Sequence, residues 1–134
     1  MTGNELADAA LTLIGAPFRL HGRDPATGLD CIGVFSAALA ICGVRVRLPN
    51  TYRLRGATLP DLARFAQHLD FERTTAAVQR GDVLFARPGP VQFHLMIATG
   101  GERYVHAHAG LRRVVLSPRP ADWLVEQVWR SSNF

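Results

Sequence analysis

The chain of 134 residues contains no lysine and only two cysteines. Two cysteines without a CxxC pair exclude a disulfide framework and argue against a structural zinc knuckle. All the cationic side chains are arginine, which we attribute to a coding bias, and the formal net charge is +4. Because the arginines are scattered rather than clustered, the sequence predicts no nucleic-acid partner.

Long apolar segments are also missing. The longest apolar run, residues 32–44, is too short and too often interrupted by small residues to span a bilayer, so no membrane segment is predicted. The N-terminal stretch MTGNELADAALTLIG carries Glu5 and Asp8 where a secretory signal would be basic. We therefore expect a chain that is cytoplasmic as synthesised and that either works inside the cell or is exported by another route.

What is present predicts one α+β domain over residues 1–134, without repeats or linkers. Thr2 and Glu5 have capping-box spacing ahead of an apolar stripe, which predicts a first helix ending at Gly15. Residues 44–58 are expected to form a short extended stretch and a loop, and residues 58–68 a further helix.

The most apolar helix is expected to begin at Cys31. Asp30 is a plausible N-cap and Gly43 a plausible stop, and the residues between them are apolar on nearly every face. A helix of this kind is buried, so we expect it to lie at the centre of the fold.

The residue pattern changes after Gly81. Short β-type runs separated by Gly and Pro turns follow it, namely DVLFA, QFHLMIAT, RYVHAHA, RRVVLS and EQVWRS. Helices followed by strands favour helices packed on an antiparallel sheet of about five strands.

Cys31 is the first candidate for chemistry. A thiol at a helix N-terminus lies in the partial positive charge of the helix end, which favours the thiolate and predicts a lowered pKa. A neighbouring imidazole would lower that pKa further by forming an ion pair with the thiolate. Cys42, at the far end of the same helix, is interpreted as a small packing residue.

Histidines supply the candidate bases. His94 opens the strand HLMIA, where it is either a packed core histidine or a base held on a rigid element. His106 and His108 alternate with small apolar residues and share one face of a strand. Such a pair is also a metal-ligand pattern, so a zinc site formed by His94, His106, His108 and Cys31 stays an alternative. His21 and His68 are assigned to a loop and a helix end.

The order of these residues resembles the NlpC-type family of papain-like cysteine peptidases. The segments GAPFRLHGRDPATGLDCIGVF and RGDVLFARPGPVQFHLMIATGGERYVHAHAG carry the resemblance, which covers nearly the whole chain. Ten residues fit the family pattern, namely Gly15, Pro17, Asp30, Cys31, Gly33, Gly81, Asp82, Phe85, His94 and His106.

The resemblance implies a papain-like fold and a role for each matching residue. Cys31 would be the nucleophile, His94 its base and His106 the polar group that orients His94, with His108 as the rival for that third place. Asp30 and Phe18 would contact substrate, and no cofactor or metal is implied. Phe18 and Ile32 depart from the family, which has tyrosine and serine at these positions.

Two functions follow from the resemblance. The first is a cysteine peptidase that hydrolyses amide bonds in peptidoglycan stem peptides through an acyl-enzyme. The second is a catalytically idle wall-binding or phage-tail-associated module with the same fold. Under either function the partner would be peptidoglycan peptide, and the oligomeric state is left open.

Overall fold

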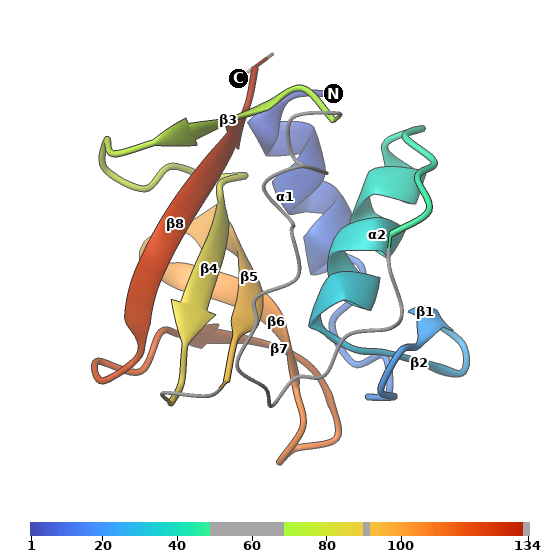
Figure 1. Cartoon of the computed structure of the whole chain (residues 1–134). Helices are drawn as coiled ribbons and strands as arrows, with labels where there is room; N and C mark the ends of the chain where they lie inside the picture. Colours follow the sequence, from blue (N-terminus) through green and yellow to red (C-terminus); the bar gives the residue numbers. More distant parts are fainter. Residues whose placement is uncertain (49–68, 90–91, 133–134) are drawn as a thin grey trace.

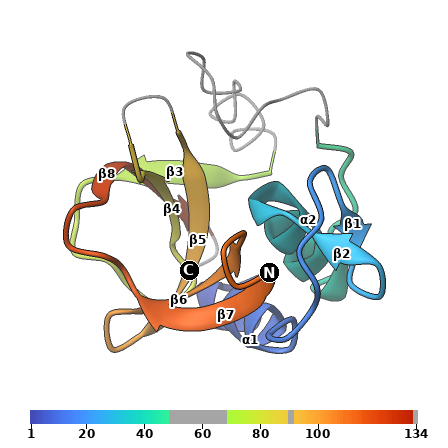
Figure 2. The ribbon, with the colours of Figure 1, turned by 90° about the horizontal axis from the view of Figure 1, so that it is seen from below.

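The computed structural model of the chain describes residues 1–48, 69–89 and 92–132. Within these residues, two helices pack on one side of a curved antiparallel sheet, and a small hairpin lies beyond the second helix (Figure 1, Figure 2). In chain order the elements are α1 (Gly3–Leu11), β1 (Arg23–Asp24), β2 (Gly28–Leu29), α2 (Cys31–Ile41), β3 (Phe71–Thr74), β4 (Val83–Arg87), β5 (His94–Gly100), β6 (Arg103–His108), β7 (Arg113–Pro118) and β8 (Leu124–Ser131).

The predicted α+β class is confirmed, and all five predicted strands are present as β4 to β8. The sheet has six strands rather than about five, in the order β3-β8-β4-β5-β6-β7. The added strand, β3, is a four-residue edge strand in which only Phe71 is buried. So short a segment carries no alternation of polar and apolar residues from which it could have been predicted.

Helix α1 begins as its sequence predicts. The hydroxyl of Thr2 accepts a hydrogen bond from the backbone N–H of Glu5 at 3.1 Å, so Thr2 is the N-cap. The helix ends at Leu11, and a turn carries the chain to Gly15, whose φ of +92° favours glycine.

Helix α2 begins at Cys31 and is buried along most of its length. Its apolar side chains pack against α1 and the sheet, and Phe35 meets the ring of Phe71 edge-on with 5.7 Å between centroids. Ile41, in the last turn, is the exception and is 55% exposed. The helix therefore lies at the centre of the fold, where it packs against α1 and contacts β5 and β6 of the sheet.

Alternation along β5 divides its side chains between the two faces of the sheet. Leu95 and Ile97 join the larger core beneath the helices, whereas Met96 and Ala98 join a smaller cluster on the other face. The end of β8 returns to the start of the chain, where the hydroxyl of Ser131 donates to the carbonyl oxygen of Met1 at 3.1 Å.

Three predictions fall wholly or partly outside this description. The helix expected over residues 58–68, which includes His68, and most of the loop expected over residues 44–58 lie outside the described residues. Among the described helices, none has the length and the apolar character needed to cross a membrane.

Candidate active site

Asp30 fixes the point at which α2 begins. One carboxylate oxygen accepts the backbone N–H of Gly33 and the other accepts the N–H of His21, each at 2.8 Å. Arg23 adds an ion pair at 3.1 Å, and the Asp30 side chain is fully buried. The carboxylate therefore caps the helix and ties it to the preceding loop, while its implied contact with substrate stays a prediction.

Cys31 lies directly after this cap and is 1% exposed. Burial is the largest cause that raises the pKa of its thiol, to about 12, and the charge of Asp30 is the second. Hydrogen bonds from the backbone N–H groups of Leu95, Ile32 and Cys31 itself act in the opposite direction.

The expected lowering of this pKa is therefore wrong in direction. A helix N-terminus stabilises a thiolate through its backbone N–H groups. The free energy needed to remove the thiolate charge from water is larger than this stabilisation, so the thiol pKa rises. Burial of this degree depends on the packing of the whole fold, which the local sequence of Cys31 does not reveal.

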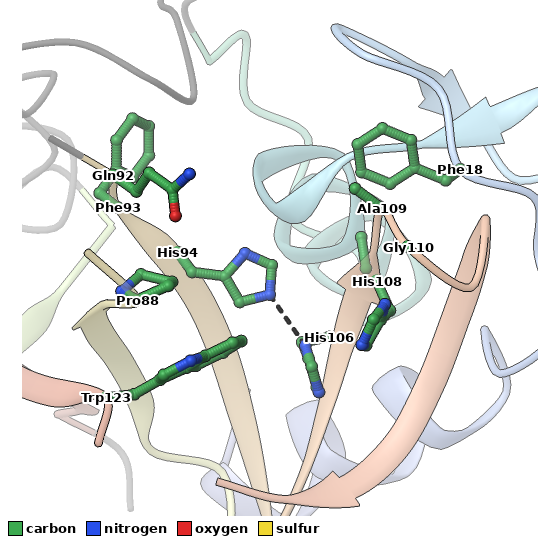
Figure 3. A pocket seen from close by; sticks show the side chains of 11 residues that line it. Phe18, Pro88, Gln92, Phe93, His94, His106, His108, Ala109, Gly110 and Trp123 are labelled. Carbon is green, nitrogen blue, oxygen red and sulfur yellow. Dashed lines mark hydrogen bonds between the residues drawn. The ribbon is translucent and has the colours of Figure 1, made fainter. Parts of the chain in front are cut away.

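His94 and His106 are brought together by two neighbouring strands. His94 is the first residue of β5 and His106 lies in β6, and Nε2 of His94 is 2.8 Å from Nδ1 of His106 (Figure 3). Of the two histidines considered for third place, His106 is the one that hydrogen-bonds to His94. His108 instead accepts the backbone N–H of Leu111 through its Nδ1 at 3.0 Å.

Both histidines are held in their neutral form. Burial, and next the neighbouring His106 and His108, lower the pKa of His94 to about 3. Burial and His108 lower the pKa of His106 to about 4. At neutral pH the site therefore contains an uncharged imidazole pair and an uncharged thiol.

Two residues that the sequence analysis missed contact the histidine pair. Trp123, between β7 and β8, meets the rings of His94 and His106 edge-on, with 5.4 and 5.9 Å between centroids. Ser117 of β7 places its hydroxyl oxygen 2.8 Å from Nε2 of His106. The alternation of RRVVLS puts Ser117 on one face with Val115, which pairs with His106, and this is the signal that could have found it.

A cavity of about 260 Å³ opens beside the histidine pair (Figure 3). Its wall contains histidine and aromatic side chains but no carboxylate or guanidinium group among the described residues; the lining residues are Phe18, Pro88, Gln92, Phe93, His94, His106, Ala107, His108, Ala109, Gly110 and Trp123. Phe18, expected to contact substrate, therefore lies on the wall opposite Trp123.

Cys31 is not among the described residues that line this cavity. The backbone N–H of Leu95, the residue that follows His94, lowers the pKa of the Cys31 thiol. No hydrogen bond joins the Cys31 thiol to His94 among the contacts of the described residues. The geometry therefore places thiol and imidazole on neighbouring elements but shows the hydrogen-bonded link only between the two histidines.

Similarity to known proteins places this geometry in a family. The sequence model of the NlpC/P60 family matches residues 15–131. The chain belongs to the NlpC/P60 family. This confirms the resemblance seen in the order of Cys31, His94 and His106. Among curated proteins, no sequence matches the chain significantly.

Solved structures of NlpC/P60 proteins share the fold. The NlpC/P60 domain of the peptidoglycan hydrolase SagA has a TM-score of 0.66 and 22% identity, covering 96% of this chain and 97% of that one. NlpC1 from Trichomonas vaginalis has a TM-score of 0.70 and 17% identity, covering 96% and 45%. The peptidoglycan hydrolase RipB from Mycobacterium tuberculosis has a TM-score of 0.65 and 23% identity, covering 96% and 63%. The chain thus spans less than half of the Trichomonas protein.

Residues of the NlpC/P60 pattern outside the site have packing roles. A Cβ atom on Gly33 would lie 2.1 Å from the carbonyl oxygen of Gly22, so only glycine lets the loop before Cys31 approach α2. Asp82 is fully buried and accepts hydrogen bonds from Nε and Nη2 of Arg130, at 2.9 and 2.8 Å. Some residues of the family pattern, such as Gly33 and Asp82, are therefore explained by close packing and buried ion pairs in the fold.

The zinc alternative finds no geometric support in the described part of the chain. No group of three or more His, Cys, Asp or Glu side chains there is arranged to hold a metal ion. Cys42 is half-buried at the end of α2 and His21 is exposed, so neither joins the histidine pair.

Proposed function

We propose that this chain is a cysteine peptidase that hydrolyses amide bonds in peptidoglycan stem peptides. Cys31 is the nucleophile, His94 the base and His106 the residue that orients His94. The observation that carries the proposal is the 2.8 Å contact between the two histidines, both of which line the cavity. NlpC/P60 membership supports it, as does the fold shared with the peptidoglycan hydrolases SagA and RipB.

The reaction begins from a neutral thiol and a neutral imidazole. His94 removes the proton from the Cys31 sulfur as that sulfur attacks the carbonyl carbon of the scissile amide. The raised pKa of the thiol and the lowered pKa of His94 both disfavour a separate ion pair before substrate binds. Proton transfer is therefore coupled to bond formation.

The later steps return the enzyme to its starting state. The tetrahedral oxyanion is stabilised by backbone N–H groups at the start of α2, including that of Cys31. His94 gives its proton to the leaving amine as the carbon–nitrogen bond breaks, which leaves a thioester on Cys31. Water, deprotonated by His94, then hydrolyses the thioester and releases the carboxylate product and the free thiol.

Digestion of purified muropeptides tests this proposal. Mass spectrometry is expected to show new amine termini with the wild-type protein and none with Cys31→Ala, because the nucleophile is gone. Cys42→Ala is the matched control, since it removes the other thiol, and it should cleave like wild type. Equal cleavage by Cys31→Ala, or loss of cleavage only in Cys42→Ala, would rule out the assigned nucleophile.

The idle wall-binding module is the second candidate. The observation that favours it is the covered Cys31, which is 1% exposed and has a raised thiol pKa. In that case wild type and Cys31→Ala would sediment equally with insoluble peptidoglycan, and neither would release new amine termini. The peptidase proposal instead predicts products that depend on Cys31.

A further inference from the structure

The hydrogen-bonded chain that starts at His94 does not stop at His106. Nε2 of His106 is 2.8 Å from the hydroxyl oxygen of Ser117. That hydroxyl also donates to the carbonyl oxygen of Pro118, at 3.1 Å. Three side chains, one from each of β5, β6 and β7, and one carbonyl group therefore form a continuous hydrogen-bonded line.

The carbonyl oxygen of Pro118, at the end of this line, determines which atom is donor and which is acceptor in each of its hydrogen bonds. A carbonyl oxygen accepts hydrogen bonds and cannot donate them. Ser117 has a single hydroxyl proton, and once that proton points to Pro118 the oxygen can only accept from Nε2–H of His106. Nδ1 of a neutral His106 is then unprotonated, so it accepts Nε2–H of His94.

We propose that Ser117 is a positioning residue that holds His106 and His94 in their Nε2–H tautomers. The consequence lies at the other end of the line: Nδ1 of His94 keeps its lone pair and is the atom able to take the thiol proton of Cys31. This catalytic consequence rests on the proposed function, whereas the tautomers themselves do not.

The opposite order of protons would disable the base. If the Ser117 hydroxyl donated to His106, then Nδ1–H of His106 would donate to His94, and Nδ1 of His94 would carry a proton. The carbonyl of Pro118 would also lose its donor. His108 offers no competing acceptor through Nδ1, because that atom already accepts the N–H of Leu111 at 3.0 Å, and Trp123 presents its ring to both imidazoles.

Nitrogen NMR of ¹⁵N-histidine-labelled protein at neutral pH tests the tautomers without requiring activity. Wild type is expected to show Nε2 protonated and Nδ1 unprotonated in both His94 and His106. Ser117→Ala should shift both residues toward mixed tautomers, because Nε2–H of His106 loses its acceptor. Ser117→Thr keeps the hydroxyl and should restore the wild-type pattern.

Ser131→Ala is the matched control, because its hydroxyl also donates to a backbone carbonyl but lies at the end of β8. Its histidine signals should match wild type. A wild-type His106 protonated at Nδ1, or tautomers in Ser117→Ala that are unchanged from wild type, would overturn the proposal.

Kinetics with a cleaved muropeptide give the second readout. Ser117 is not among the described residues that line the cavity, so Ser117→Ala should lower kcat by about tenfold, the size of one hydrogen bond, and leave KM unchanged. A raised KM with unchanged kcat would contradict a positioning role. If wild type cleaves nothing while the tautomers respond as expected, the proposed function fails and the proton order stands.

Discussion

At the scale of single side chains, Trp123 is the aromatic residue that lies against the histidine pair. Its half-buried indole stands edge-on to both His94 and His106 and forms one wall of the cavity. Because burial is the largest cause of the lowered pKa of each histidine, the indole is part of what keeps them neutral.

Replacing Trp123 by alanine is expected to raise the pKa of His94 and of His106 toward the ordinary value of 6.5. Water then reaches the rings and stabilises their protonated forms. NMR titration of the two histidines measures the shift, and Leu124→Ala, at the exposed neighbouring position, is the control. Unchanged midpoints in Trp123→Ala would show that the indole does not contribute to their burial.

The lowered pKa values also predict how stability depends on pH. The unfolded chain takes up protons on its histidines below about pH 6.5, whereas folded His94 resists protonation down to about 3. The free energy of unfolding therefore falls with decreasing pH in this window, by at most about 1.4 kcal/mol per pH unit for each such histidine.

His94→Gln removes one of these groups. Urea unfolding at about pH 7 and about pH 5 should show a smaller loss of stability for His94→Gln than for wild type. The same loss in both proteins would mean that His94 titrates alike in the folded and unfolded chains.

The sequence predicts a site residue when the position of that residue depends on local features, and it fails when the position depends on contacts with distant segments. The positions of Cys31 at a helix start and of His94 at a strand start could be predicted because both are local features, whereas their catalytic roles stay predictions. The pKa direction of Cys31 was wrong, and Ser117 and Trp123 were missed, because burial and cross-strand contacts arise only when distant segments pack.

At the scale of elements, the N-cap of α2 decides where Cys31 lies. Asp30→Ala should lower the free energy of unfolding by about 3 kcal/mol, since it removes a buried cap and leaves Arg23 without that carboxylate. Thr2→Ala removes the exposed cap of α1 and should cost about 1 kcal/mol. Denaturant unfolding compares the two, and equal losses would show that the contacts of Asp30 beyond capping add nothing.

Element boundaries were predictable where a side chain marks them. Thr2 and Asp30 cap the two described helices, and Gly- and Pro-rich turns separate β4 to β8, as the sequence indicated. The two-residue strands β1 and β2 and the edge strand β3 were missed because such short segments are defined by their partners.

At the scale of the whole molecule, Gly81, which lies just before β4, packs closely against the backbone of Gly3 at the start of α1. A Cβ atom built there would lie 2.1 Å from the carbonyl oxygen of Gly3, and the φ of Gly81 is +93°. The sheet that carries His94 and the helix layer that carries Cys31 therefore meet at a backbone contact that only glycine allows.

Gly15 and Gly81 have nearly equal φ values, so comparing their alanine variants distinguishes the steric clash at Gly81 from backbone strain. Gly15, at +92°, has nothing within 4 Å of the position that a Cβ atom would take, so Gly15→Ala should cost only about 1–2 kcal/mol of strain. Gly81→Ala carries the same strain plus a steric clash and should cost at least about 2 kcal/mol more. Equal melting temperatures for the two variants would contradict the close contact.

Strand order could not be predicted from the chain alone. The last strand, β8, enters the sheet between β3 and β4, and Arg130 within it pairs with the buried Asp82 at 2.8 Å. Neither pattern of alternation nor turn composition specifies that placement, since it depends on which edges remain open when the earlier strands have paired.

Covalent labelling by a stem-peptide analogue with a thiol-reactive electrophile at the scissile position tests the proposed chemistry most directly. If Cys31 is the nucleophile and His94 its base, peptide mapping will find one adduct per chain on Cys31, slowed by His94→Ala and blocked by excess muropeptide. Labelling of Cys42 at the same rate, or labelling of Cys31 that neither His94→Ala nor muropeptide affects, would contradict a peptidase site at this helix start.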